Sequence, residues 1–97
     1  MLVLPKQAIS DAIARHTDAK SALEIWYRIV RDQRWETPMD AKRRYSSASF
    51  VKGNKVVFNI KGNKYRLVTV IDYVSEIVDV RFFGTHSEYD KINMEKL

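Results

Sequence analysis

KVVFNIKGNKYRLVTVI, residues 55–71, is the stretch that decides the fold. Apolar residues fall at alternate positions over 55–60, and a second run of strand-forming residues follows over 64–71. Lys61-Gly62-Asn63 separates the two runs and is typical of a tight turn. We therefore expect this stretch to form an antiparallel hairpin.

The segments on either side of the hairpin extend the predicted sheet. Residues 77–83 form another strand run after a connection over 72–76, and Gly84-Thr85 is expected to end it. Phe50-Val51 marks a short strand before the hairpin. Residues 87–93 are expected either to turn through a short helix or to remain irregular.

The first half of the chain is helical in pattern. Apolar residues recur at helical spacing from Pro5 to Arg15 and again from Ala19 to Arg31, with Thr17 or Asp18 as N-cap of the second helix. Thr37-Pro38 opens a short basic helix to about Arg44. The sequence thus predicts one α+β domain over 1–97, with two N-terminal helices and a short third packed on one face of a three- to four-stranded antiparallel sheet.

Composition excludes several classes of protein. The chain has no cysteine, which rules out disulfides and thiolate metal sites. No segment has the order of a signal peptide or the length of a membrane span, so we expect a cytoplasmic protein with no membrane partner.

The net charge of +5 is concentrated in one part of the sequence. No acidic residue lies between Asp40 and Asp72, so that block carries +8 while the rest of the chain carries −3. Such a block attracts polyanions, which predicts a nucleic-acid or acidic-protein partner rather than a solvated face alone. We take as RNA-binding candidates Lys42, Arg43, Arg44, Lys55, Lys61 and Lys64.

Four residues on or just after the last two predicted strands are candidates for RNA cleavage: Arg66, Arg81, His86 and Tyr89. No carboxylate cluster has the spacing of a metal site, so we expect neither a metal nor another cofactor, and attack by the RNA 2′-hydroxyl instead. That reaction needs a cation to stabilise charge on the phosphate and groups to move protons. Arginine suits the first role, and histidine or tyrosine suits the second.

Each candidate also has a structural interpretation, which for Arg66 is a surface residue at a sheet edge. Asp79 is a possible salt-bridge partner of Arg81, and His86 can be an ordinary hydrogen-bonded surface residue. Tyr89 can be a packing aromatic. His16 has no plausible catalytic partner residue in the sequence and is left out of the predicted site.

The segments FNIKGNKYRLV (58–68) and VRFFGTHSEYDKI (80–92) resemble the HigB group of RelE-like toxins, ribosome-dependent mRNA interferases of bacterial toxin–antitoxin operons. Specific residues carry the resemblance over roughly 45–92, and before that only the order of helices is similar. The resemblance implies a RelE-like fold whose second sheet face is open to the ribosomal A site. It also implies that Arg66, Arg81, His86 and Tyr89 are catalytic.

The resemblance further implies the partners of the protein. These are the ribosome and mRNA, and a cognate HigA-like antitoxin with a helix-turn-helix part, through which alone the complex binds operator DNA. The main alternative is a non-catalytic basic module that binds RNA or the ribosome. A DNA-binding regulator ranks lower because the short basic helix is not paired with a recognisable helix-turn-helix.

Overall fold

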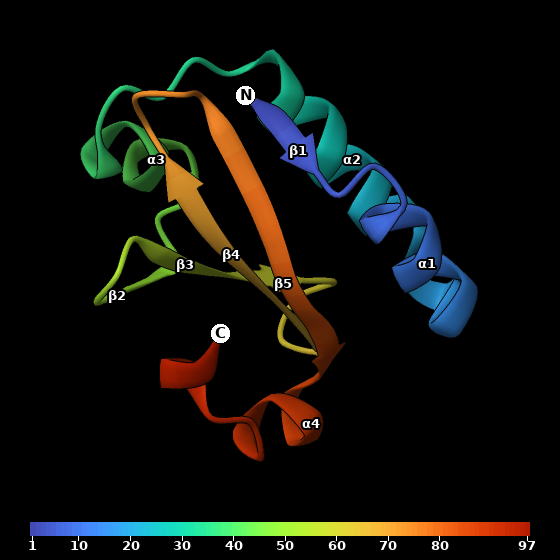
Figure 1. Cartoon of the computed structure of the whole chain (residues 1–97). Helices are drawn as coiled ribbons and strands as arrows, with labels where there is room; N and C mark the ends of the chain where they lie inside the picture. The colour runs from blue at the N-terminus through green and yellow to red at the C-terminus, as the bar shows by residue number, and fades with distance from the viewer.

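The computed structural model describes all residues, 1–97, as an α+β fold, which confirms the predicted class. The sheet has five strands in the order β1-β5-β4-β3-β2. The elements are β1 (Leu2–Leu4), α1 (Ala8–Arg15), the 3-10 turn η1 (Thr17–Ala19), α2 (Lys20–Asp32), α3 (Pro38–Arg44), β2 (Ser49–Val51), β3 (Lys55–Ile60), β4 (Tyr65–Asp72), β5 (Ile77–Thr85), α4 (His86–Asp90) and the 3-10 turn η2 (Met94–Lys96). Figure 1 shows α1 and α2 side by side along the sheet, with α3 near its other edge.

The central hairpin forms as the sequence predicts. β3 and β4 pair antiparallel from Lys55↔Val70 to Ile60↔Tyr65, and the loop between them is four residues long, 61–64. Lys61 and Gly62 both have positive φ there, at 54° and 64°. Glycine adopts that conformation without cost, which explains its place in the turn.

One strand was not predicted from the sequence. β1 pairs with β5 in parallel, in the register Leu2↔Ile77 to Leu4↔Asp79, so the sheet is mixed and larger than the expected three to four antiparallel strands. Three residues are too few for alternation to be visible, and the strand exists only because β5 offers it an edge. The helix expected from Pro5 accordingly begins later, at Ala8.

The helices pack on one face of the sheet around Phe58. Trp26 of α2 meets the Phe58 ring edge-on at 5.4 Å, and Trp35 stacks on it at 6.5 Å between ring centroids. Tyr45, at the end of α3, meets the same ring at 5.1 Å. Phe58 and Ala41 of α3 are fully buried. Trp26 and Trp35 are therefore both core residues.

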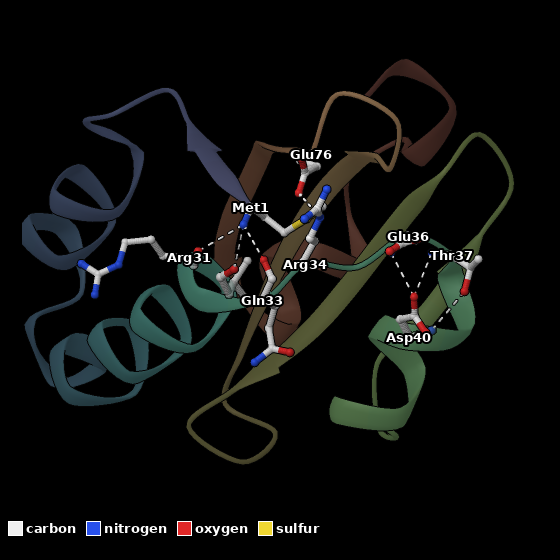
Figure 2. A network of polar contacts seen from close by, with 9 residues as sticks. Met1, Arg31, Gln33, Arg34, Glu36, Thr37, Asp40 and Glu76 are labelled. Atoms are coloured by element: carbon white, nitrogen blue, oxygen red, sulfur yellow. Dashed lines mark hydrogen bonds and ion pairs between the residues drawn. The ribbon is translucent and has the colours of Figure 1, made fainter.

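The N-terminus is held against the end of α2. The Met1 ammonium donates to the carbonyl oxygens of Val30, Arg31 and Gln33, at 3.4, 3.1 and 2.7 Å, as Figure 2 shows. The Val30 carbonyl also accepts from the Gln33 N–H at the C-cap, and a cation at this end of the helix offsets the helix dipole. The contact fixes the β1 edge strand beside α2.

The start of α3 is set by its own sequence. Thr37 accepts from the Asp40 backbone N–H, and Asp40 accepts from the Thr37 N–H, with Pro38 at the first helical position (Figure 2). This capping box confirms the predicted N-cap. In contrast, neither Thr17 nor Asp18 caps α2, whose N-cap is Ala19.

A β-bulge interrupts β5 opposite Val68 and Thr69. The register passes from Thr69↔Val80 to Val68↔Phe82, which leaves Arg81 without a partner on β4. The bulge shifts the alternation of faces along β5, because without it Phe83 would share a face with Arg81. Phe83 is instead buried in the core, while Arg81 is exposed.

The C-terminal segment partly covers the sheet face opposite the helices. Asp79 alternates with the core residue Val78 and therefore points to that face, where Arg81 binds it and also donates to the Leu97 carbonyl at 2.7 Å. Figure 1 shows α4 and the C-terminus at the lower end of β5, away from α1 and α2. The second face is therefore less open than the resemblance implies. None of the helices combines the length and apolarity needed to cross a bilayer.

Candidate active site

The end of the sheet where β4 begins and β5 ends brings Arg66 close to His86. Arg66 on β4 pairs with Gly84 on β5, and directly paired Cα atoms in antiparallel strands lie about 5 Å apart. The His86 backbone N–H donates to the Lys64 carbonyl at 3.1 Å, which fixes the start of α4 against the β3–β4 loop. Two of the four predicted catalytic residues thus lie at one strand end.

The Arg66 guanidinium is held in place by the loop beside it. Its Nη1 donates to the carbonyl oxygens of Asn63 and Tyr65, at 3.0 and 3.2 Å. No carboxylate forms an ion pair with it, and Arg66 is half-buried. Its remaining N–H groups are available to a ligand's phosphate, whose oxygens match the guanidinium fork.

The imidazole of His86 is oriented by Asp90, one helical turn further along α4. His86 Nδ1 lies 3.0 Å from Asp90 Oδ2, and both side chains are exposed. An ionised carboxylate only accepts, so Nδ1 carries a hydrogen in this contact and Nε2 is left for proton transfer. Asp90 was missing from the predicted site, although its i,i+4 spacing from His86 is visible in the sequence.

A capping box builds the short helix that carries these groups. Thr85 Oγ1 accepts from the Glu88 N–H, and Glu88 Oε1 accepts from the Thr85 N–H at 2.8 Å. That backbone hydrogen bond lowers the pKa of Glu88. The pattern Thr-x-x-Glu is a common sequence signature of a helix start. This segment was expected either to form a short helix or to remain irregular, and it forms the helix α4.

Gly84 makes the close approach of α4 to β5 possible. A Cβ at this position would lie 2.7 Å from Phe82 Cζ and 2.9 Å from Glu88 Oε1. Both distances are shorter than real Cβ contacts. The glycine is therefore required by packing against the capping box, not by an unusual φ.

Tyr89 lies on the same helix, three residues after His86. Residues at this spacing share a helix face, so Tyr89 and His86 are neighbours. Tyr89 is half-buried, and its hydroxyl has no hydrogen-bond partner within the chain. Its phenol is available to a ligand.

Arg81 lies apart from this group. It is three residues before Gly84, about 10 Å along the strand. Its Nε donates to Asp79 at 2.9 Å, and its Nη1 donates to the Leu97 carbonyl. The salt bridge with Asp79, which was the structural alternative to a catalytic role for Arg81, is therefore present. An arginine held this way must exchange partners before it can reach a phosphate bound at Arg66.

Asp18 neutralises part of the predicted basic surface. Its carboxylate accepts from Lys61 at 3.2 Å and also from Lys64 and the Tyr65 hydroxyl. The hydrogen bond from Lys64, followed by that from Tyr65, lowers the pKa of Asp18 well below its usual range. This cluster was not predicted, because Asp18 is more than forty positions from its partners in the sequence.

The other predicted RNA-binding residues are spread over two ends of the sheet. Lys42 donates to the Ala48 carbonyl at 3.3 Å and lies over the Phe50 ring, and Arg43 pairs with Asp40 at 3.1 Å. Arg44 lies over the Tyr45 ring and has no carboxylate partner. Lys55 begins β3 and Lys61 follows its end, which separates them by about 20 Å. The basic block is thus continuous in sequence but divided in space.

His16 lies next to the site although it was left out of the prediction. Its ring packs against Tyr65 at 4.9 Å and Phe83 at 5.7 Å, and its Nε2 is 3.8 Å from Glu88 Oε1. These contacts link the loop before α2 to the capping box of α4. Its role here is packing beneath the site. No group of three or more histidine, cysteine or acidic side chains gathers closely enough to hold a metal ion.

Comparison with known proteins points to one group. The family model described as the RelE-like toxic component of a toxin–antitoxin system, the HigB toxin family, matches residues 19–92. The chain is also 24% identical over 94 residues to the mRNA interferase HigB of Escherichia coli O6:H1, an alignment that covers 95% of this chain and 91% of that relative.

Proposed function

Because this chain belongs to the HigB family of RelE-like toxins from toxin–antitoxin systems, we propose that it is a ribosome-dependent endoribonuclease that cleaves translated mRNA. The name of the Escherichia coli relative, mRNA interferase, supports this reaction. The observation that carries the proposal is that Arg66 and the His86–Asp90 pair lie close together at one end of the sheet. Residues 1–97 act in this account as one toxin domain.

The proposed reaction uses the RNA 2′-hydroxyl as nucleophile. The oxygen attacks the adjacent phosphorus, the P–O5′ bond breaks, and the products are a 2′,3′-cyclic phosphate and a 5′-hydroxyl. Arg66 stabilises the charge that builds on the non-bridging oxygens, where a guanidinium fork meets two of them. His86 moves a proton through Nε2 while Asp90 holds Nδ1. No metal or other cofactor takes part in this mechanism.

Arg81 and Tyr89 have supporting roles. Tyr89 lies beside His86 on α4 and either donates a proton to the leaving 5′ oxygen or stacks on a base. Arg81 is a second phosphate ligand that leaves Asp79 and the Leu97 carbonyl when RNA enters. The exchange of one carboxylate for a phosphate keeps the arginine charge-paired throughout.

The partners follow from the family and from the charge of the surface. Lys42, Arg43, Arg44, Lys55, Lys61 and Lys64 bind ribosomal RNA and the mRNA backbone in this proposal. A toxin–antitoxin system implies an antitoxin that binds the toxin. We place the protein with translating ribosomes in the cytoplasm, and on operator DNA only through a helix-turn-helix antitoxin.

A reconstituted cleavage assay tests the proposal. The purified chain is added to ribosomes holding a defined mRNA with a codon in the A site, and in parallel to the same mRNA without ribosomes. We expect cutting in the first reaction only, with 2′,3′-cyclic phosphate and 5′-hydroxyl ends. Arg66→Ala and His86→Ala should lower the rate by about 100-fold or more.

Arg28→Ala serves as the matched control, because Arg28 is an exposed arginine on α2, outside the candidate site. It should cleave like the wild type. Binding to ribosomes without any cleavage would instead favour the non-catalytic RNA-binding module. Cleavage that survives both site variants would show that the chemistry lies elsewhere in the chain.

A further inference from the structure

Aromatic and basic side chains gather where α3 meets the edge strand β2. Phe50 pairs with Val56 near the start of β3, whereas Arg66 pairs with Asn59 near its end, so this surface lies at the opposite end of the sheet from the candidate active site. Two grooves share Phe50. One, of about 250 Å³, is lined by α3, and the other, of about 220 Å³, continues past the β2–β3 turn to Tyr73. We call their lining the β2-edge surface, whose main residues are Met39, Lys42, Phe50, Lys52, Lys55 and Tyr73.

The rings of the β2-edge surface are accessible to a ligand. Phe50 and Tyr73 pack against the core and are nevertheless only half-buried. Met39, which lines the same groove as Phe50, is 58% exposed. An apolar cluster left open in this way is typical of a binding surface. Part of each ring is therefore available for stacking.

The lysines around these rings carry charge that the chain does not neutralise. Lys42, Lys52 and Lys55 form no ion pair. No acidic residue lines either groove. Lys42 Nζ lies 5.3 Å from the centroid of the Phe50 ring. The β2-edge surface therefore combines ring faces with unpaired cations.

The other grooves of the molecule differ in charge or composition. In the groove between α2 and the β3–β4 hairpin, Lys61 is paired with Asp18. Glu24 lines the groove between α1 and α2. Glu95 lines a groove beyond the β2–β3 turn that has no aromatic residue. Only the two grooves at Phe50 contain a ring, no carboxylate and cations that are all unpaired.

We propose that the β2-edge surface binds an unstacked base of a structured RNA, together with the phosphates next to that base. Aromatic rings such as Phe50 and Tyr73 bind a splayed-out base by stacking, and the lysines bind the flanking phosphates. This second RNA site goes beyond the function proposed above, because it lies away from Arg66 and His86 and takes no part in cleavage.

RNA fits this surface better than an acidic protein segment does. A nucleotide carries a ring and a negative charge side by side, which matches the Phe50 ring with Lys42 over it. An extended peptide would pair with the free edge of β2, but that strand has only three residues and offers few backbone hydrogen bonds. Bases inside a duplex have no free ring face, so the ligand must present a base in a bulge or loop.

The position of the site predicts its effect on the proposed reaction. Lys55 pairs with Val70, which is four residues beyond Arg66 on β4 and about 13 Å along the strand. RNA bound here anchors the protein while the mRNA reaches Arg66. Loss of the site should therefore raise KM for ribosome-bound mRNA and leave kcat unchanged.

Fluorescence anisotropy with two RNA hairpins tests the inference. One hairpin has a single-nucleotide bulge, and the other is identical but fully paired. The wild type should bind the bulged hairpin about 5-fold or more tightly, the range of one stacked base. Phe50→Leu keeps an apolar side chain but removes the ring, so it should lose this preference and bind the paired hairpin like the wild type. Tyr73→Leu repeats the test if Phe50→Leu melts early by circular dichroism.

Matched controls separate the site from general effects of ring or charge. Tyr27→Leu removes a half-buried tyrosine on α2 that also has an arginine over its ring, Arg31 at 5.8 Å, and it should keep the preference for the bulge. Lys52→Ala should weaken binding of both hairpins by about 3-fold or more. Lys20→Ala removes an exposed lysine at the start of α2 and should weaken it by less.

Several outcomes would overturn the inference. These are equal wild-type affinity for the two hairpins, a preference for the bulge that survives in Phe50→Leu and Tyr73→Leu, and an equal loss in Tyr27→Leu. Displacement of the bulged hairpin by polyglutamate but not by a second bulged RNA would assign the surface to an acidic protein instead. A chain that cuts no mRNA but prefers the bulge through Phe50 would remove the proposed function and keep this site.

Discussion

Asp18 connects the helical layer to the candidate active site. It binds Lys64, whose backbone carbonyl accepts the His86 N–H, and Tyr65, which pairs in register with Thr85. One carboxylate between α1 and α2 thus holds the loop against which α4 begins. Because Tyr65 donates to Asp18, the same hydrogen bond raises the pKa of the Tyr65 phenol.

Asp18→Asn should change how stability depends on pH. The folded-state pKa of Asp18 lies below its usual value of 3.8, so its contribution is present above that value and is lost as pH falls through the folded value. Urea unfolding from about pH 6 to about pH 2 should show wild type more stable than Asp18→Asn at the upper end, with the gap closing on acidification.

The other carboxylates are common to both proteins, so the difference between the two curves isolates Asp18. Asp40, Asp72 and Glu88 also have lowered pKa values and give both proteins a shared acid slope. Parallel curves across the whole range would mean that the Asp18 cluster does not hold in solution.

Gly84→Ala should destabilise the protein through overpacking. The new Cβ would meet Phe82 and the Glu88 carboxylate at less than 3.0 Å, and relief would require the capping box to move. We expect a loss of about 1–3 kcal/mol in the free energy of unfolding. Gly84→Ala combined with Glu88→Ala should lose less than the two single losses added together, because Glu88 is part of the clash. Simple additivity would contradict the packing account.

At the scale of elements, α4 is short and depends on its cap. A five-residue helix has too few internal hydrogen bonds to form alone, so the Thr85–Glu88 box and the contact with β5 determine its position. His86 and Tyr89 are therefore only as ordered as this cap allows.

Thr85→Ala should lower the cleavage rate more than its effect on stability suggests. Loss of an N-cap costs about 1 kcal/mol and should raise hydrogen exchange over residues 86–92. Thr37→Ala removes the equivalent cap from α3 at a similar cost, without touching the proposed proton-transfer groups. A lower kcat in Thr85→Ala and an unchanged kcat in Thr37→Ala are the expected results. Equal effects on kcat would indicate that only global stability matters.

Local patterns predicted most of the elements. The β3–β4 hairpin and the Thr37 cap of α3 depend on residues close in sequence, and both were predicted. β1 and the bulge at Arg81 depend on pairing with distant strands, so no local pattern reveals them. The α4 cap was missed even though its Thr85-x-x-Glu88 pattern is local.

The same distinction applies to the candidate site. Arg66, His86 and Tyr89 were named from residue type and resemblance, and pairing of β4 with β5 brings them to one strand end. Asp90 and Asp18 were not predicted. Asp90 is one helical turn from His86, a spacing that is visible only once this segment is known to be helical, and the contacts of Asp18 are long-range. The catalytic roles themselves stay predictions.

At the scale of the whole molecule, the basic residues do not act as one patch. Lys61 and Lys64 are already paired with Asp18, whereas Arg44 and Lys55 have no carboxylate partner. Removing Arg44 or Lys55 therefore removes a full phosphate contact. Removing Lys61 or Lys64 removes a cation whose charge is already partly neutralised by Asp18.

The salt dependence of RNA binding should separate these two groups. Arg44→Ala and Lys55→Ala should each reduce the slope of log K against log salt by about 0.7, the value for one single-strand phosphate contact. Lys61→Ala should reduce it by less. Fluorescence anisotropy with a short single-stranded RNA at several salt concentrations measures all three. A larger change for Lys61→Ala than for Arg44→Ala would contradict the charge pairing described here.

The most direct test of the central claim is to map mRNA 5′ ends in a bacterial host that lacks the antitoxin. Wild type, Arg66→Ala, His86→Ala and the control Arg28→Ala are induced at equal levels, and growth is followed. We predict growth arrest and new in-frame 5′-hydroxyl ends for the wild type and Arg28→Ala, and neither for the two site variants although they remain folded. Unchanged mRNA in cells that express the wild-type chain would contradict the account.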